Sequence, residues 1–254
     1  MRTAGSRAFR PHLHLVCRLP KGYNGSRHPT EVEPVPAAIF DMDGVLVDSN
    51  AAHFRAWQSF GKRYGIEIDE AIFAKYINGR RNDEFLEEMY PGRWSAEERL
   101  RISDEKEAYY REHYVPEVPP VPGVVDFIKS LKRRGVPLAL ATSAVRENAD
   151  LILSLLGIES AFSAKVTGLE VPAAKPNPAI FVEAARRLGI PAEQCVVFED
   201  SPAGVEAAVR AGARCVAIAT TVAPQILLGR GAHRVLDHFE GVDAGELFSS
   251  LGLG

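Results

Sequence analysis

The chain has 254 residues, of which 46% are hydrophobic and 25% charged, an ordinary composition for a globular protein with a buried core. Its 30 basic and 33 acidic residues give a net charge of −3, which excludes the basic surface that nucleic-acid binding requires. No apolar stretch approaches the roughly 18 residues of a membrane span. Composition therefore predicts a soluble chain, most simply a monomer, with neither a nucleic-acid nor a membrane partner.

The first 35 residues differ from the rest of the chain. Residues 1–30 contain several arginines and no acidic residue, and Pro11 and Pro20 interrupt the short apolar part, which argues against a secretory signal. We predict a disordered or wrongly assigned extension over residues 1–35, with a transit peptide as the alternative. The three cysteines form no Cys-x-x-Cys pair, so a reducing, cytoplasmic setting is expected.

The elements then follow in order along the chain. Residues 37–40 read as a short buried strand, and residues 51 to about 115 are almost wholly helical in pattern. Within that block, Asp48 or Ser49 is placed to cap a first helix, and Ser95 with Glu98 forms a capping-box sequence before a long charged helix. The proline-rich segment 116–122 is predicted to be too stiff for a helix.

From Gly123 onward, helical and strand patterns alternate. Short apolar strands separated by helices imply right-handed crossovers and a parallel sheet. The sequence thus predicts an α/β, Rossmann-like core over residues 36–49 and 117–254, with a helical insertion at 50–116. The expected helices are 124–134, 147–156, 178–188 and 202–211, and the expected strands are 137–141, 195–198 and 215–219.

Polar residues gather where the predicted strands end. In parallel sheets, ligands bind beyond the carboxyl ends of the strands. This rule selects four places, which are Asp41–Asp43, Thr142–Ser143, the loop around Lys175, and Glu199–Asp200.

These residue types suit phosphoryl chemistry. Asp41 and Asp43 can flank one reacting centre as nucleophile and general acid/base, and Gly44 permits the tight turn between them and the next element. The adjacent acids Glu199 and Asp200 favour a divalent cation, and oxygen-only ligands favour magnesium. Each motif also has a plainer interpretation, because D-x-D-G occurs in turns and calcium loops, and Asp200-Ser-Pro is a common helix start.

The combined pattern resembles the haloacid dehalogenase superfamily over about residues 37–220. The motifs that carry the resemblance are Asp41-Met-Asp-Gly-Val-Leu-Val-Asp-Ser49, Thr142, Lys175-Pro-Asn-Pro178 and Phe198-Glu-Asp-Ser-Pro-Ala-Gly204. The resemblance implies that Asp41 attacks phosphorus while Asp43 serves as acid and base. It also implies that Thr142 and Lys175 hold the transferring group, and that magnesium is bound by Asp41, the carbonyl of Asp43, Asp200 and, directly or through water, Glu199.

The helical insertion is similar to the cap of the β-phosphoglucomutase branch of that superfamily. The similarity implies substrate contacts from His53, Trp57, Gly79 and Lys106, together with Gly44 and Ser143 of the core. That branch's cap arginine, which grips a second phosphate, is replaced here by Asn82, although Arg80 and Arg81 are close.

The motifs and their resemblance to this superfamily indicate one expected function and two alternatives. We expect a magnesium-dependent phosphatase acting on a small phosphorylated metabolite, most simply a sugar phosphate. A phosphohexomutase on the same scaffold is the first alternative. Asn82 in place of the cap arginine weakens this alternative, because a mutase would have to hold two phosphates at once. A non-catalytic phosphate-binding domain is the second, and the presence of Asp41 and Lys175 speaks against it.

Overall fold

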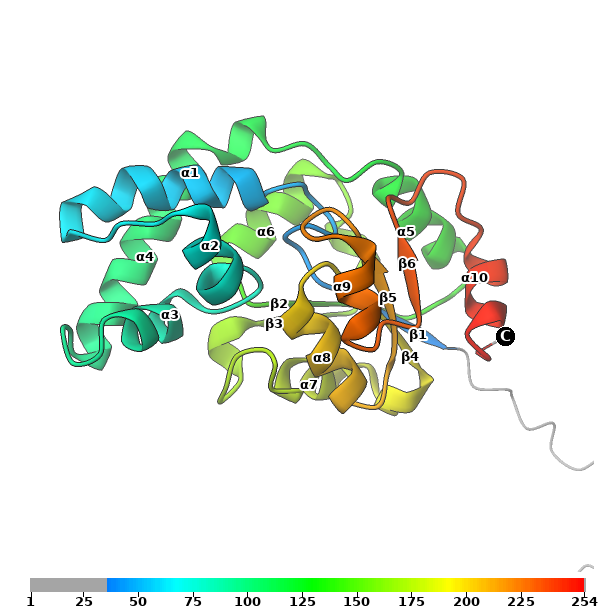
Figure 1. Ribbon diagram of the computed structural model, residues 1–254. Helices are drawn as coiled ribbons and strands as arrows, with labels where there is room; N and C mark the ends of the chain where they lie inside the picture. Colours follow the sequence, from blue (N-terminus) through cyan, green and yellow to red (C-terminus); the bar gives the residue numbers. More distant parts are fainter. Residues whose placement is uncertain (1–35, 254) are drawn as a thin grey trace, which may run out of the picture. The chain divides into compact units, whose positions relative to one another are not determined.

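A computed structural model describes residues 36–253, which belong to one compact unit built on a six-stranded sheet (Figure 1). The sheet order is β3-β2-β1-β4-β5-β6, and every neighbouring pair is parallel. The predicted α/β fold with a parallel sheet is therefore confirmed. The strands are β1 Ala37–Phe40, β2 Leu138–Thr142, β3 Ala164–Thr167, β4 Cys195–Glu199, β5 Arg214–Ile218 and β6 Arg234–Leu236.

The central strand β1 is buried on both of its faces. Ala38 and Phe40 pack into one hydrophobic cluster with α5, α6 and α10, while Ala37 and Ile39 pack into another with α7, α8 and α9. Coverage of both faces explains why this strand reads as a continuous apolar run. The helices are α5 Val124–Arg133, α6 Arg146–Leu155, α7 Ala179–Leu188, α8 Pro202–Arg210, α9 Pro224–Gly229 and α10 Ala244–Ser250.

The sequence pattern missed the two outer strands, β3 and β6, and the short helices α9 and α10. An outer strand is only partly covered, so its residues need not be apolar. In β3, Lys165 interrupts the apolar pattern, and its ammonium group pairs with Asp150 and Glu159. Such a strand does not stand out from a loop by composition.

The first four α-helices after β1 form the helical insertion, with α1 Asn50–Phe60, α2 Glu70–Ile72, α3 Asn82–Met89 and α4 Ala96–His113. A hydrophobic cluster that includes Trp57, Phe60 and Phe85 holds these helices together. The predicted capping box is present, since Glu98 N–H donates to Ser95 Oγ (3.2 Å) and Ser95 N–H donates to the Glu98 carboxylate (2.8 Å). Whether the insertion is a separately moving domain with the boundaries 50–116 stays a prediction.

Two local predictions need correction. Ser49 stands at the N-cap position of α1, but its hydroxyl does not cap the helix and donates to Asp43 instead. Val115–Glu117 forms a single 3₁₀ turn, because proline is tolerated in the first turn of a helix and only the residues after it remain extended or irregular. The extension predicted over residues 1–35 lies outside the described residues. Within residues 36–253 no helix is long and apolar enough to cross a membrane.

Candidate active site

The sheet topology brings two of the predicted acidic motifs together. β1 lies between β2 and β4, and the chain continues from β1 toward β2 on one side but reaches β4 on the other. Ligands bind at such reversals of strand order in open α/β sheets. Asp41 follows β1 directly, and its N–H donates to the carbonyl of Phe198 in β4 (3.0 Å), so that Asp41 lies beside Glu199 and Asp200.

Lys175 joins these acids at the centre of the site. Its Nζ lies 3.0 Å from Asp41 Oδ2 and 2.5 Å from Glu199 Oε1, and its side chain is buried. Burial by itself would lower the pKa of Lys175, but the two carboxylates raise it above its usual value. The lysine is therefore a permanent positive charge inside the site.

The two carboxylate oxygens of Asp41 have different surroundings. Oδ2 is held by Lys175, whereas Oδ1 is buried without a hydrogen-bond partner among the described residues. Burial raises the pKa of Asp41 to about 7, with Lys175 opposing the shift and Glu199 adding to it. A nearby cation would favour the ionised form. Asp41 thus presents one oriented oxygen and one open oxygen at the strand end.

The acidic cluster fits a hard divalent cation. Asp41, Glu199 and Asp200 are all buried, and one carboxylate oxygen of each lies within 4.8 Å of the others. Glu199 already accepts bonds from Lys175, from Ser201 and from two backbone N–H groups, which is consistent with a role beside the ion or through water. Oxygen-only donors of this kind suit Mg²⁺.

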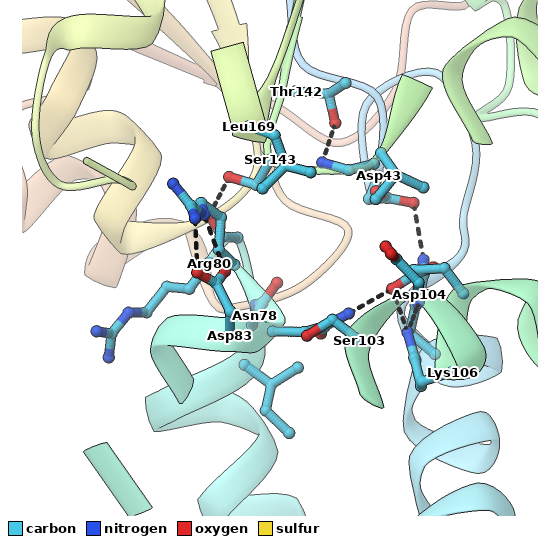
Figure 2. A pocket seen from close by; sticks show the side chains of 18 of the residues that line it. Asp43, Asn78, Arg80, Asp83, Ser103, Asp104, Lys106, Thr142, Ser143 and Leu169 are labelled. Carbon is cyan, nitrogen blue, oxygen red and sulfur yellow. Dashed lines mark hydrogen bonds and ion pairs between the residues drawn. The ribbon is translucent and has the colours of Figure 1, made fainter. Parts of the chain in front are cut away.

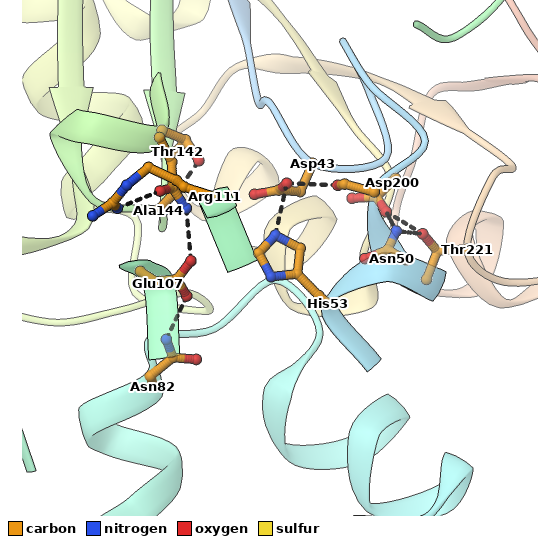
Figure 3. A network of polar contacts seen from close by, with 12 residues as sticks. Asp43, Asn50, His53, Asn82, Glu107, Arg111, Thr142, Ala144, Asp200 and Thr221 are labelled. Carbon is orange, nitrogen blue, oxygen red and sulfur yellow. Dashed lines mark hydrogen bonds and ion pairs between the residues drawn. The ribbon is translucent and has the colours of Figure 1, made fainter. Parts of the chain in front are cut away.

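Asp43 is held in place by residues of the helical insertion and its linker. Asp43 Oδ1 accepts hydrogen bonds from Ser49 Oγ (2.6 Å) and His53 Nε2 (3.2 Å; Figure 3). Because Lys106 Nζ lies 2.7 Å from Nδ1 of His53 and an ammonium group only donates, the proton of the imidazole belongs on Nε2. Burial would raise the pKa of Asp43, but His53 and Ser49 together hold it below its usual value.

A small polar cavity of about 70 Å³ opens between the strand ends and the insertion (Figure 2). Asp41, Asp43 and Thr142 line it from the core, and His53 and Lys106 line it from the insertion. Thr142 Oγ1 accepts a bond from Ala144 N–H (3.1 Å), which leaves its hydroxyl proton available to a ligand oxygen. This volume lies below the roughly 300–1,000 Å³ of most ligand pockets.

The insertion touches the core at the mouth of this cavity. Ser143 Oγ donates to the carbonyl of Gly79 (2.9 Å). Gly79 has φ +72°, and a Cβ there would lie 2.4 Å from Ser201 Oγ. A side chain at this position would therefore push the insertion away from the core.

Two further predicted residues lie outside the cavity wall. Gly44 has φ +72°, and a Cβ there would lie 2.0 Å from Asp200 Oδ2, so its role in the structure is to let that carboxylate approach the backbone. Trp57 is fully buried in the hydrophobic cluster of the insertion, with its ring beneath Lys106 at 5.6 Å. An amphipathic pattern cannot distinguish the side of a helix that faces a hydrophobic cluster from the side that faces a cavity when both sides carry an aromatic residue.

Sequence reasoning missed several polar residues of the site. Asn50 Nδ2 and the hydroxyl of Thr221 both donate to Asp200 Oδ2, and Thr220 Oγ1 donates to the carbonyl of Gly44 (Figure 3). The two threonines follow β5 after one residue, Ala219, so the same rule about strand ends would have found them. Glu107 lines the cavity as well, and no motif pointed to it.

Comparison with known proteins agrees with this architecture. A family model for haloacid dehalogenase-like hydrolases matches residues 35–212. A phosphorylated carbohydrates phosphatase of Thermotoga maritima is 36% identical over 181 residues, which are 69% of this chain and 81% of that protein. A solved structure of β-phosphoglucomutase from Clostridium difficile aligns with a TM-score of 0.75 at 25% identity, covering 86% of this chain and 98% of the other.

A longer relative is the chloroplastic protein SUPPRESSOR OF QUENCHING 1 of Arabidopsis thaliana, which is 32% identical over 225 residues. That match takes in 85% of this chain but only 21% of the relative. The residues that the family model matches include the strand ends that carry Asp41, Thr142 and Glu199. The chain is an enzyme of the haloacid dehalogenase-like hydrolase family.

Proposed function

We propose that the chain is a magnesium-dependent phosphatase that hydrolyses a small phosphomonoester, most simply a sugar phosphate, through an aspartyl-phosphate on Asp41. The observation that carries this proposal is the asymmetry of Asp41, whose Oδ2 is held by Lys175 while Oδ1 has no partner among the described residues. A carboxylate oriented in this way needs no base to activate it. The phosphatase of Thermotoga maritima supports the choice of substrate class.

In the first step, Asp41 Oδ1 forms a bond to phosphorus while the bond from phosphorus to the leaving oxygen breaks. Asp43 gives its proton to that oxygen, and a bound phosphate dianion raises the pKa of Asp43 by like-charge repulsion, which favours the protonated form the step needs. In the second step, Asp43 takes a proton from water as the water oxygen attacks phosphorus. Asp41 is then released with inorganic phosphate.

The remaining residues position the transferring group. Lys175 and the hydroxyl of Thr142 are placed to offset charge on its equatorial oxygens, where electrostatic stabilisation supplies most of the rate in phosphoryl transfer. Magnesium, held by Asp41, Asp200 and the carbonyl of Asp43, would reduce the repulsion between an anionic nucleophile and an anionic phosphate. The insertion acts as a cap that closes over the site and excludes bulk water.

The alternative is a phosphohexomutase, which the β-phosphoglucomutase structure brings into consideration. A mutase has to hold a second phosphate in the cap. Arg80 pairs with Glu88 (2.8 Å) and Arg81 with Asp83 (2.6 Å), so both candidate arginines already have carboxylate partners within the insertion. This pairing supports the phosphatase.

A phosphate-release screen over phosphorylated metabolites, with magnesium present and Asp41→Asn as the blank, tests the proposal. Release from at least one neutral sugar or polyol phosphate is expected. A parallel assay with β-glucose 1-phosphate and a trace of the 1,6-bisphosphate separates the two candidates. Formation of glucose 6-phosphate faster than inorganic phosphate would overturn the phosphatase.

A cytoplasmic monomer is part of the same proposal. It rests on composition and on Cys195 and Cys215, which are buried free thiols.

A further inference from the structure

The positive charges that line the cavity from the insertion are all neutralised. Arg80, Arg81 and Lys106 are the arginines and lysines of the cavity wall. Each of them lies within 2.8 Å of a carboxylate oxygen of the insertion. The partners are Glu88 for Arg80, Asp83 for Arg81 and Glu107 for Lys106.

Glu107 differs from the other two partners because it is buried. Its Oε1 accepts hydrogen bonds from Asn82 Nδ2 (2.6 Å) and Lys106 Nζ (2.8 Å). Its Oε2 accepts a bond from Asn148 Nδ2 (2.6 Å), and Asn148 Oδ1 in turn accepts a bond from Arg111 (2.7 Å; Figure 3). Both oxygens are therefore satisfied, and the carboxylate is held in one position.

This carboxylate stays ionised under all ordinary conditions. Burial would raise its pKa, but Lys106, His53 and the hydrogen bond from Asn82 lower the pKa of Glu107 to about 2. Asn148 belongs to α6 of the core, so Glu107 also ties the insertion to the core beside the cavity. The paired Lys106 and Glu107 thus line the space that the leaving group of a substrate would fill, and Lys106 has no charge left over for a second anion.

We propose that Glu107 is a specificity-determining residue that rejects substrates with a second anionic group. This inference rests on the proposed phosphatase function and narrows its substrate class to phosphomonoesters whose remaining part is uncharged. A second phosphate or a carboxylate would find Arg80, Arg81 and Lys106 already paired with carboxylates, and in the case of Lys106 that partner is Glu107. Hydroxyl groups would instead meet the uncharged polar residues Asn78, Asn82 and Ser103 of the wall.

The first experiment uses the unaltered protein and matched pairs of substrates. The pairs are glucose 6-phosphate with glucose 1,6-bisphosphate, fructose 1-phosphate with fructose 1,6-bisphosphate, and glycerol 3-phosphate with 3-phosphoglycerate. Within each pair that is hydrolysed, we expect kcat/KM to be at least about tenfold higher for the neutral member, which is the substrate whose part beyond the phosphate is uncharged. Equal or better hydrolysis of the members with a second anionic group would overturn the inference. Failure to hydrolyse any of the compounds would instead count against the phosphatase itself.

The second experiment replaces the charge. In Glu107→Gln the preference for the neutral member is expected to shrink by about tenfold, because Lys106 loses its carboxylate partner and becomes available to a second anion. Glu112→Gln, an exposed acid on the same helix, makes the same change in net charge and should leave the preference as it is. Melting temperatures of both variants show whether each is folded. An unchanged preference in folded Glu107→Gln would overturn the assignment.

Discussion

The core and the helical insertion each bury one lysine against carboxylates, and the two groups are built differently. In the core, Lys175 faces Asp41 and Glu199 with Asp200 nearby, so the acids outnumber the lysine and one oxygen of Asp41 has no partner among the described residues. In the insertion, Lys106 and Glu107 balance each other, and both oxygens of Glu107 are bonded. The first group carries excess negative charge and an unpaired oxygen, so it can bind a cation and react with a phosphate. In the second group the positive and negative charges balance.

This contrast separates two tasks of an active site. Excess negative charge is costly to bury, and a site that carries it gains stability when a cation binds. A balanced pair gains nothing from a further charge and is suited to hold a shape and to leave no free cation for a second anion. We therefore connect the core group with the chemistry and the insertion group with the choice of leaving group.

The largest effect is expected at the open oxygen of the core. Asp41→Asn should lower turnover by more than about a hundredfold, because the amide has the same shape but is not a nucleophile. The fold should persist, since Lys175 keeps its contact with Glu199. Asp150→Asn, which removes a core carboxylate that pairs with Lys165, is the matched control and should retain full turnover. Substantial turnover by Asp41→Asn would remove Asp41 from the role of nucleophile.

Removal of metal tests the excess charge of the core directly. Chelation should abolish phosphate release, and magnesium should restore it, with calcium a poor substitute because its coordination is larger and looser. Asp200→Asn should need a higher magnesium concentration for half-maximal rate. The measurement is the rate as a function of added metal, and full activity in the presence of chelator would contradict the metal site.

The balanced pair of the insertion should be important for stability. Lys106→Met leaves the charge of Glu107 buried without its cation, and losing one partner of a buried pair typically costs about 3–5 kcal/mol of unfolding free energy. Lys165→Met is the control, because Lys165 pairs with Asp150 at a partly exposed site, where such pairs contribute about 0–1 kcal/mol. Denaturant unfolding measures both values. A loss in Lys106→Met no larger than in the control would show that the pair is not a stabilising unit.

Acid should weaken the same pair. The pKa of Glu107 is lowered from 4.5 to about 2 in the folded protein, so the stability that its charge contributes is present above pH 4.5 and is lost as pH falls toward 2. The difference in melting temperature between the wild-type protein and Glu107→Gln should therefore shrink across that range. A difference that stays constant between pH 5 and roughly pH 2 would argue against a charged Glu107.

The smallest effect is expected on the exposed side of the insertion. Ser95→Ala removes the hydroxyl that accepts the N–H of Glu98 at the start of α4, and such losses cost about 1 kcal/mol. Turnover should not change, because this helix end is far along the helix from Lys106 and Glu107. A large loss of activity would mean that the start of α4 is coupled to the cavity.

The core and the insertion also differ in how many of their site residues can be predicted from the sequence. At the strand ends, Asp41, Thr142 and Glu199 were predicted correctly as neighbours, because the rule for parallel sheets converts a position along the chain into a position in space. In the insertion no such rule exists. Trp57 was expected at the substrate and lies in the hydrophobic cluster, and Glu107 was not considered although it lines the cavity.

By itself, the sequence determined the parallel sheet, the capping box of α4 and the places of the acidic motifs after β1 and at the end of β4. These features depend on local periodicity and on short motifs, which a single chain displays directly. The tertiary structure alone decided that Asn82 and Asn148 converge on Glu107, and that Asn50 and Thr221 meet at Asp200. These contacts join elements that are distant in sequence. Packing within the insertion, within the core and between the two brings them together, which no local pattern encodes.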